Sequence, residues 1–325
     1  MKREFKVKNI SRQSWLCIFA ACVCLLVPAA YALAQTTTSE VRTSRPKAFA
    51  TAEQAADALI AAAEQSDSGR MVQIFGPEGE DIVLTGEPAR DRQLAQAFAA
   101  QARKKHAISE VPKGSGRAFL IVGDEDWPFP VPIVKQGNQW SFDAKAGRHE
   151  ILMRRIGRNE LDAIQICHGY VDAQEEYALE KRQGYDVNQY AQRIISTPGK
   201  QDGLVWRNPD GTLGGPIGEK IALALEQGYT TKAEPYHGYY FKVLKGQGPD
   251  APLGQMDYVI QGVMIGGFAL VASPAEYEVT GVKSFIVSQD GVVYEKDLGP
   301  GTLDAFAKME LFNPDKTWSP VEDTD

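Results

Sequence analysis

The chain has 325 residues, with 35 lysines and arginines against 42 aspartates and glutamates and a formal net charge of −7. An acidic chain is repelled by phosphate backbones and anionic lipids, which argues against nucleic acid and anionic membrane surfaces as partners. The length is sufficient for a hydrophobic core in one or two domains. Solubility alone also accounts for an acidic surface.

The N-terminus predicts export. Basic residues precede an apolar run at 16–30, and Ala32 and Ala34 form a small-residue cleavage signature, so residues 1–34 read as a signal peptide cut after Ala34. The run is shorter than the roughly 20 residues of a permanent span, so no stable membrane span is expected after cleavage. An uncleaved N-terminal anchor is the alternative. The expected location is periplasmic or secreted.

Cysteine usage fits a chain without internal disulfides. Cys17, Cys22 and Cys24 lie in the predicted signal, so Cys167 alone remains after cleavage. The signal also removes five basic residues and one acidic residue, which leaves a net charge of about −11.

After a flexible leader at 35–47, helices and then strands predict a small α+β domain at 48–150. A helix is expected within 49–67, where Thr51 and Gln54 form a capping box, and another at 89–106. Its apolar side would hold Leu94, Phe98 and Ala102, and a loop is expected at 74–83.

Strands are expected at 117–123, 129–135 and 139–143, with a turn between the last two. Because proline cannot donate to a strand ladder, Pro130 and Pro132 predict an edge strand.

A second domain is predicted at 151–310. Asn159 is expected to cap a long helix, and 185–196 and 216–229 read as shorter helices. Between these pieces lies a long loop rich in Gly, Pro, Asn and Asp, a type that is often functional. The apolar stripe of the long helix is expected at Leu161, Ile164, Cys167, Val171 and Ala178.

The last third has strand-like patterns at 237–246, 257–274, 283–288 and 292–297. Asp290 and Gly291 supply a hairpin turn. A short helix at 302–309 and a polar tail at 311–325 complete the chain. The predicted fold class is therefore α+β, with two domains of helices packed on antiparallel sheets.

Candidate catalytic residues lie on the long helix. His168, Asp172 and Glu176 recur at helical spacing and could share a face with Glu175, which suits a metal or a carboxylate pair. A solvated charged face is the alternative. The adjacent Cys167 falls on the apolar stripe, which favours a buried hydrophobe over a catalytic thiol.

Two further sets of polar residues lie in the loops and strands. His237 with Asp250 is a second candidate catalytic pair. Asn208, Asp210 and Asp250 offer oxygen ligands for calcium, the one cofactor considered, although turn chemistry explains the same residues.

Aromatic residues are the stronger indication of binding. Strand alternation sends Tyr239 and Phe241 to one face and Tyr240 to the other, so one set can pack in the core while the other faces out. The alternative is that most of the aromatic side chains belong to the core. Aromatic side chains near Gly-rich loops suit recognition of a protein or glycan-like ligand. The candidate binding residues are Trp127, Trp206, Tyr236, Tyr239 and Tyr240.

Long phrases such as "GRHEILMRRIGRNELDAI", "STPGKQDGLVW" and "SFIVSQDGVVYEKDLG" resemble a bacterial family of exported proteins, domain of unknown function 2950. The resemblance runs from about Phe49 to Gly299. It implies a periplasmic or secreted protein of Gram-negative bacteria and no particular activity.

The C-terminal half is similar to the globular part of pilins and pseudopilins, in which an aromatic residue and an Asp-Gly-Val turn end the sheet. Phe285, Asp290, Gly291 and Val292 fill those places, but the hydrophobic stem of a pilin is missing before the long helix. The N-terminal element order is similar to folds of the nuclear-transport-factor type.

These observations favour an exported binding or assembly module of the envelope over an enzyme. Its partner would be an envelope protein or a glycan-like ligand, bound by the loop at 196–216 and the strand at 236–241. The alternative is an envelope hydrolase or metal-assisted enzyme that uses His168, Asp172 and Glu176.

Overall fold

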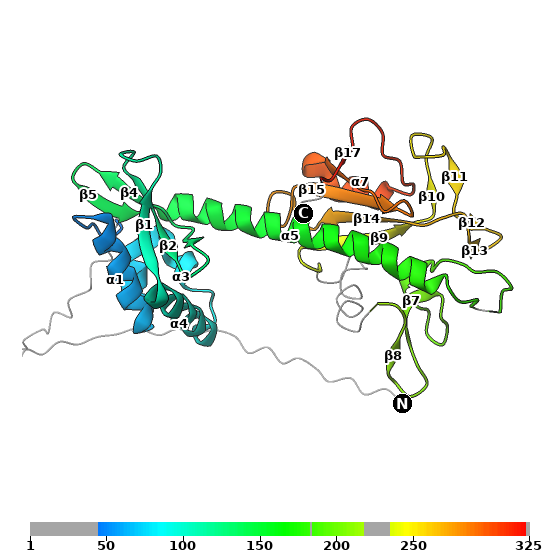
Figure 1. Ribbon diagram of the computed structural model, residues 1–325, viewed down its shortest axis with the longest axis horizontal. Coiled ribbons are helices and arrows are strands. Elements are labelled where there is room, and N and C mark those ends of the chain that lie inside the picture. Colours follow the sequence, from blue (N-terminus) through cyan, green and yellow to red (C-terminus); the bar gives the residue numbers. More distant parts are fainter. Residues whose placement is uncertain (1–44, 183, 218–234, 323–325) are drawn as a thin grey trace, which may run out of the picture. The chain divides into compact units, whose positions relative to one another are not determined.

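The computed structural model describes residues 45–182, 184–217 and 235–322 (Figure 1). The predicted signal at 1–34, most of the leader at 35–47 and most of the predicted helix at 216–229 lie outside the described residues. Within the described ranges, no helix combines the length and the apolar character that a membrane span requires. The fold is α+β, as predicted.

The first part of the described chain consists of helices followed by an antiparallel sheet. The helices are α1 (Ala52–Glu64), α2 (Ser68–Phe75), the 3-10 helix η1 (Pro77–Gly79), α3 (Glu80–Val83) and α4 (Pro88–Lys104). The strands are β1 (His106–Glu110), β2 (Arg117–Val122), β3 (Trp127–Pro128), β4 (Ile133–Gln136) and β5 (Gln139–Phe142). Their order is β1-β2-β4-β5, with β3 paired to β2, and α1 packs against α4 and β5.

Helix α1 begins at the predicted cap, where Thr51 Oγ1 accepts a hydrogen bond from Gln54 N at 3.2 Å. The predicted apolar side of α4 is wrong at Leu94, which is 53% exposed. The buried residues of α4 are Ala95, Ala99 and Ala102. These small side chains of α4 lie in a helix that packs against the alanine-rich helix α1.

Two loop and strand predictions in this part are also wrong. Residues 74–83, expected as a loop, contain the end of α2, η1 and α3. The strand expected at the sheet edge is β4, which lies between β2 and β5. Pro130 and Pro132 precede its first residue, Ile133, so no ladder donor is missing from the strand.

Helix α5 (Ala144–Tyr177) begins earlier than predicted. Its cap is Asp143, whose side chain accepts from Ala146 N at 3.0 Å, and not Asn159. The expected domain boundary at 150/151 falls inside this helix, which contributes Ala144 to one hydrophobic core and Cys167 to the other. Its predicted stripe is wrong at Leu161, which is 57% exposed.

The chain after α5 is mostly β structure. The elements are β6 (Arg193–Ile195), β7 (Gly203–Arg207), β8 (Leu213–Gly214), β9 (Tyr239–Leu244), β10 (Gly246–Gln247), β11 (Met256–Asp257), β12 (Val259–Ile260), β13 (Val263–Met264), β14 (Ala269–Pro274), β15 (Lys283–Ser288), β16 (Val293–Asp297), the 3-10 helix η2 (Gly299–Gly301), α7 (Thr302–Lys308) and β17 (Ser319–Pro320).

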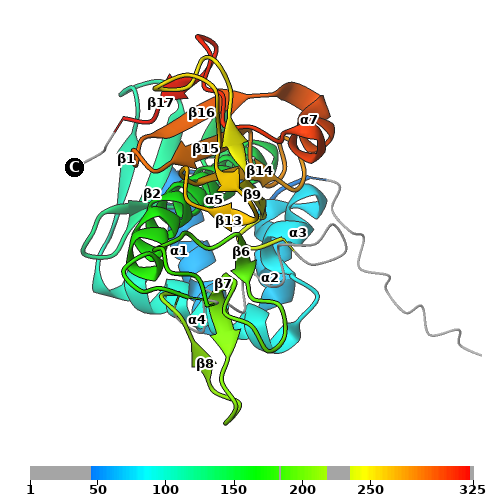
Figure 2. The same ribbon diagram turned by 90° about the vertical axis from the view of Figure 1, so that its right-hand side faces the viewer.

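The main C-terminal sheet is antiparallel, in the order β17-β16-β15-β14-β9. Helix α5 packs on β14, β15 and β16, and α7 contacts β14 (Figure 2). The predicted Asp290-Gly291 turn joins β15 to β16, with Gly291 at a φ of +76° and Val292 N donating to Asp290 Oδ1. The expected polar tail contributes β17 to the sheet edge.

The segment at 185–216 differs from the prediction. Residues 185–196, expected as a helix, contain only the strand β6. The expected long loop contains β7 and β8, which form a small sheet with β6 in the order β6-β7-β8. Strands β6 and β7 are parallel, with Ile195 opposite Val205.

Candidate functional site

A two-residue turn presents His237 at the start of β9. Tyr236 and Tyr239 exchange both backbone hydrogen bonds across it, at 3.1 and 2.9 Å. His237 and Gly238 both have positive φ, 47° and 76°, as a type I′ turn requires. Non-glycine residues rarely adopt this conformation, and those that do are often found at functional sites.

Contacts with α5 and the segment before β15 hold this turn in place. Asn159 Nδ2 donates to Thr280 O at 2.8 Å, and a Cβ at Gly238 would lie 2.8 Å from each of these two side chains. Only glycine therefore fits at the second turn position. One helical turn further along α5, the Asp162 carboxylate accepts a hydrogen bond from His237 Nδ1.

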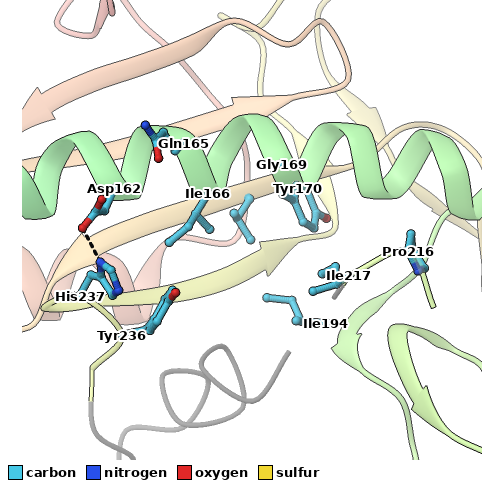
Figure 3. Close-up of a pocket in the computed structure, with 11 residues that line it drawn as sticks. Asp162, Gln165, Ile166, Gly169, Tyr170, Ile194, Pro216, Ile217, Tyr236 and His237 are labelled. Carbon is cyan, nitrogen blue, oxygen red and sulfur yellow. Dashed lines mark hydrogen bonds and ion pairs between the residues drawn. The ribbon is translucent and has the colours of Figure 1, made fainter. Parts of the chain in front are cut away.

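The carboxylate–imidazole pair lies at one end of a cavity of about 350 Å³ (Figure 3). Asp162 is 28% and His237 44% exposed at the side chain, so the pair is accessible but partly shielded from water. The Tyr236 ring lies against the imidazole, with ring centroids 4.2 Å apart. Among the residues that line the rest of the cavity, most are apolar: Ile166, Tyr170, Ile194, Pro216, Ile217 and Leu270.

One face of α5 forms a wall of the cavity. Asp162, Gln165, Ile166, Gly169 and Tyr170 are spaced at helical intervals and all line it. A Cβ at Gly169 would meet no atom within 4 Å, so a side chain at this position would extend into the open space. The absence of a side chain at Gly169 therefore helps to keep the cavity open.

A sequence model of the family described as "Protein of unknown function (DUF2950)" matches residues 46–321. The chain belongs to this family. The comparison with curated proteins and the comparison with solved structures gave no match. The likenesses to pilins and to nuclear-transport-factor folds therefore remain predictions.

The DUF2950 chain places the predicted binding tyrosines in different surroundings. Tyr239 is fully buried, and its Oη donates to Lys283 O at 2.8 Å, so this side chain is part of the core and is not an accessible ligand contact. Burial, with the nearby Glu160 carboxylate, raises the pKa of Tyr239 well above its usual range. Tyr240 is half-buried, and the predicted alternation with Tyr239 and Phe241 is confirmed.

Trp206 lies beside a second cavity, of about 340 Å³, that Ile195, Pro198 and Leu213 also line. The indole Nε1 donates to Asn208 Oδ1 at 3.2 Å, and the Arg182 guanidinium lies 4.8 Å from the ring centroid. Trp206 of β7 in this DUF2950 protein therefore contacts a residue just after its own strand and a residue just after α5.

The remaining aromatic candidate belongs to the first part of the chain. Trp127 is 46% exposed, and the Arg154 guanidinium lies 5.4 Å from its ring centroid. It does not line either of the two cavities described above.

The predicted metal or catalytic set on α5 is solvated. His168, Asp172 and Glu176 are all exposed, and none lines the cavity next to His237. Across the described part of the DUF2950 chain, no three His, Cys, Asp or Glu side chains gather as metal ligands would. These side chains therefore form a solvated charged face, which was the alternative to a metal or catalytic site.

The calcium candidates serve chain turns. Asp210 Oδ1 accepts from Thr212 N at 2.9 Å and from Thr212 Oγ1 at 2.6 Å, and these hydrogen bonds lower the pKa of Asp210. Asn208 Nδ2 also donates to Thr212 Oγ1. Asp250 exchanges two hydrogen bonds with Asn313, at 2.8 and 2.9 Å, so the predicted pairing of His237 with Asp250 is wrong.

Asp162 is the functional candidate that sequence reasoning missed. It lies 75 residues before His237, and no spacing rule relates the two. The one available signal was the dipeptide His237-Gly238 between two tyrosines, because a residue before glycine in a strand-rich stretch suits a type I′ turn. That signal would have located the histidine on a turn, but not its partner.

Proposed function

We propose that this protein is an exported binding module of the bacterial envelope, and that its ligand occupies the cavity between α5, β6 and the His237 turn. The observation that carries the proposal is the cavity itself, with apolar walls and one polar end at Asp162 and His237. Its volume of about 350 Å³ lies in the range of small-molecule sites, which are mostly apolar with a few placed polar groups.

The uncommon backbone conformation at the polar end of the cavity also supports the proposal. A histidine with positive φ is held between a glycine that tolerates no side chain and a carboxylate from another element. A turn that served chain reversal alone would be more stable with Asn-Gly. The arrangement therefore favours recognition over simple structure.

The test is ligand-observed NMR with a panel of small amphiphilic molecules and protein purified from cells that express the full chain. Gly169→Leu fills the cavity from α5, and Gly157→Leu is the matched control, because a Cβ at Gly157 also meets no atom within 4 Å and this residue does not line the cavity. Both changes favour helix formation. We expect saturation transfer to panel members in wild type and Gly157→Leu, and its loss in Gly169→Leu.

Equal signals in all three proteins, or no signal in any, would contradict the proposal.

General-base catalysis is the second candidate, and the Asp162–His237 pair is the observation that favours it. A carboxylate on Nδ1 orients the imidazole and leaves Nε2 to accept a proton. If the protein turns over a bound ligand, His237→Gln should abolish turnover while the ligand still binds. Turnover that persists in this variant would exclude His237 as the base.

A further inference from the structure

The cavity has one fixed charge among the described residues that line it. Asp162 is acidic, and no lysine or arginine is present in that set. The only hydrogen bond that the described residues make to the Asp162 side chain is the one from His237. A partly shielded carboxylate with a single partner can accept further hydrogen bonds, and such charge-assisted bonds are the strong ones.

The His237 imidazole and the Tyr236 ring at this end can also accept hydrogen bonds or attract positive charge, while the Gln165 amide that lines the same cavity offers both donors and an acceptor. When Nδ1 of a neutral imidazole donates to Asp162, Nε2 carries a lone pair and accepts. The Tyr236 ring lies tilted at 55° to the imidazole, with ring centroids 4.2 Å apart, and an aromatic ring of this kind attracts cations. Both groups therefore suit a ligand that donates hydrogen bonds and carries positive charge.

The apolar walls lie next to this acceptor-rich end. Ile166 on α5, Ile217 and Leu270 on β14 line the same cavity, so a ligand with its charged group at Asp162 would place an apolar body against them. Figure 3 shows the Ile166 and then the Ile217 side chain on going from the Asp162–His237 end along the cavity.

We infer that the ligand class is an organic amine, with its ammonium group on Asp162 and Tyr236 and an apolar body in the cavity. This inference rests on the proposed function. An anionic ligand would bring a second negative charge next to Asp162, which disfavours it unless His237 is protonated.

The experiment compares three probes of similar shape by isothermal titration calorimetry: phenethylamine, 2-phenylethanol and 3-phenylpropionate. Work at pH 8 keeps the amine charged. The proteins are wild type, Asp162→Asn, Gly169→Leu and Gly157→Leu. Asparagine preserves the shape of Asp162 and can still accept from His237, so this variant is expected to fold.

We expect phenethylamine to bind wild type and Gly157→Leu at least about tenfold more tightly than either other probe. Asp162→Asn should reduce its affinity to that of the alcohol, and Gly169→Leu should abolish binding of all three. If the alcohol or the carboxylate binds as tightly as the amine and Gly169→Leu abolishes it, the amine inference is wrong and the binding cavity stands. If none of the probes binds wild type, both the amine inference and the proposed function fail.

Discussion

Cys167 shows how position decides the chemistry of a single residue. It is the only cysteine among the described residues, it is fully buried on α5, and burial raises the pKa of its thiol from 9.0 to about 12. A thiol that keeps its proton is a poor nucleophile. We therefore interpret Cys167 as a hydrophobic core residue.

Native Cys167 should be inert to a thiol-reactive disulfide reagent at pH 8 and should react once the chain is unfolded in guanidinium. The reagent's absorbance measures the extent of the reaction.

The raised thiol pKa of Cys167 also affects the free energy of unfolding. Above pH 9 the unfolded thiol ionises while the folded thiol stays neutral, so the free energy of unfolding falls as the pH rises toward about 12. Cys167→Ala should lose this part of the alkaline slope. Rapid modification of the native protein would contradict the buried assignment.

Substitutions of the tyrosines before and after the turn should affect different properties, binding for Tyr236 and stability for Tyr239. Tyr239→Phe removes the 2.8 Å hydrogen bond to Lys283 O and should lower the free energy of unfolding by about 1 kcal/mol in urea titrations. Tyr236→Ala removes a half-buried ring that lines the cavity, and should weaken probe binding more than stability. A Tyr239→Phe protein of unchanged stability and weaker binding would contradict this division.

At the scale of elements, the cavity depends on two local structures: one face of α5 and the turn before β9. Asn159 and Asp162 occupy neighbouring positions on that face, and both hold the turn region, one through Thr280 and the other through His237. The helix therefore positions the turn as well as forming a wall.

The turn itself can be tested with two substitutions. His237→Asn gives the Asn-Gly pair that type I′ turns favour, so it should keep or raise thermal stability although it removes the imidazole that donates to Asp162. His237→Val places a β-branched residue at a φ of 47°, and should cost about 1–3 kcal/mol in unfolding free energy. Equal stability of the two variants would show that the turn does not constrain residue 237.

Strong local signals predicted several elements well. The strand at 283–288 coincides with β15, the Asp-Gly turn follows it, and α1 begins at its predicted cap. The predictions of a helix at 185–196 and of a long loop after it were wrong because β6 and β7 pair across an intervening segment, and such pairing overrides local helical and loop patterns.

At the scale of the whole molecule, neither the DUF2950 match nor the α+β fold tests the cellular location of the protein, so export remains a prediction. Expression of the full chain in a Gram-negative host, followed by cell fractionation and N-terminal sequencing, tests it. We expect a periplasmic or secreted product that begins at Gln35, because cleavage is predicted after Ala34. Ala34→Arg should block processing. A full-length product in the cytoplasm would contradict export.

The sequence alone was enough to establish the fold class, the family resemblance and the positions of the elements with the strongest turn and cap signals. Those features depend on residues that are neighbours along the chain, where periodicity, capping and turn chemistry act directly. Only the tertiary structure revealed the pairing of Asp162 with His237 and the cavity beside them. Their contact spans 75 residues and depends on how α5 packs against the turn before β9, which no local pattern encodes.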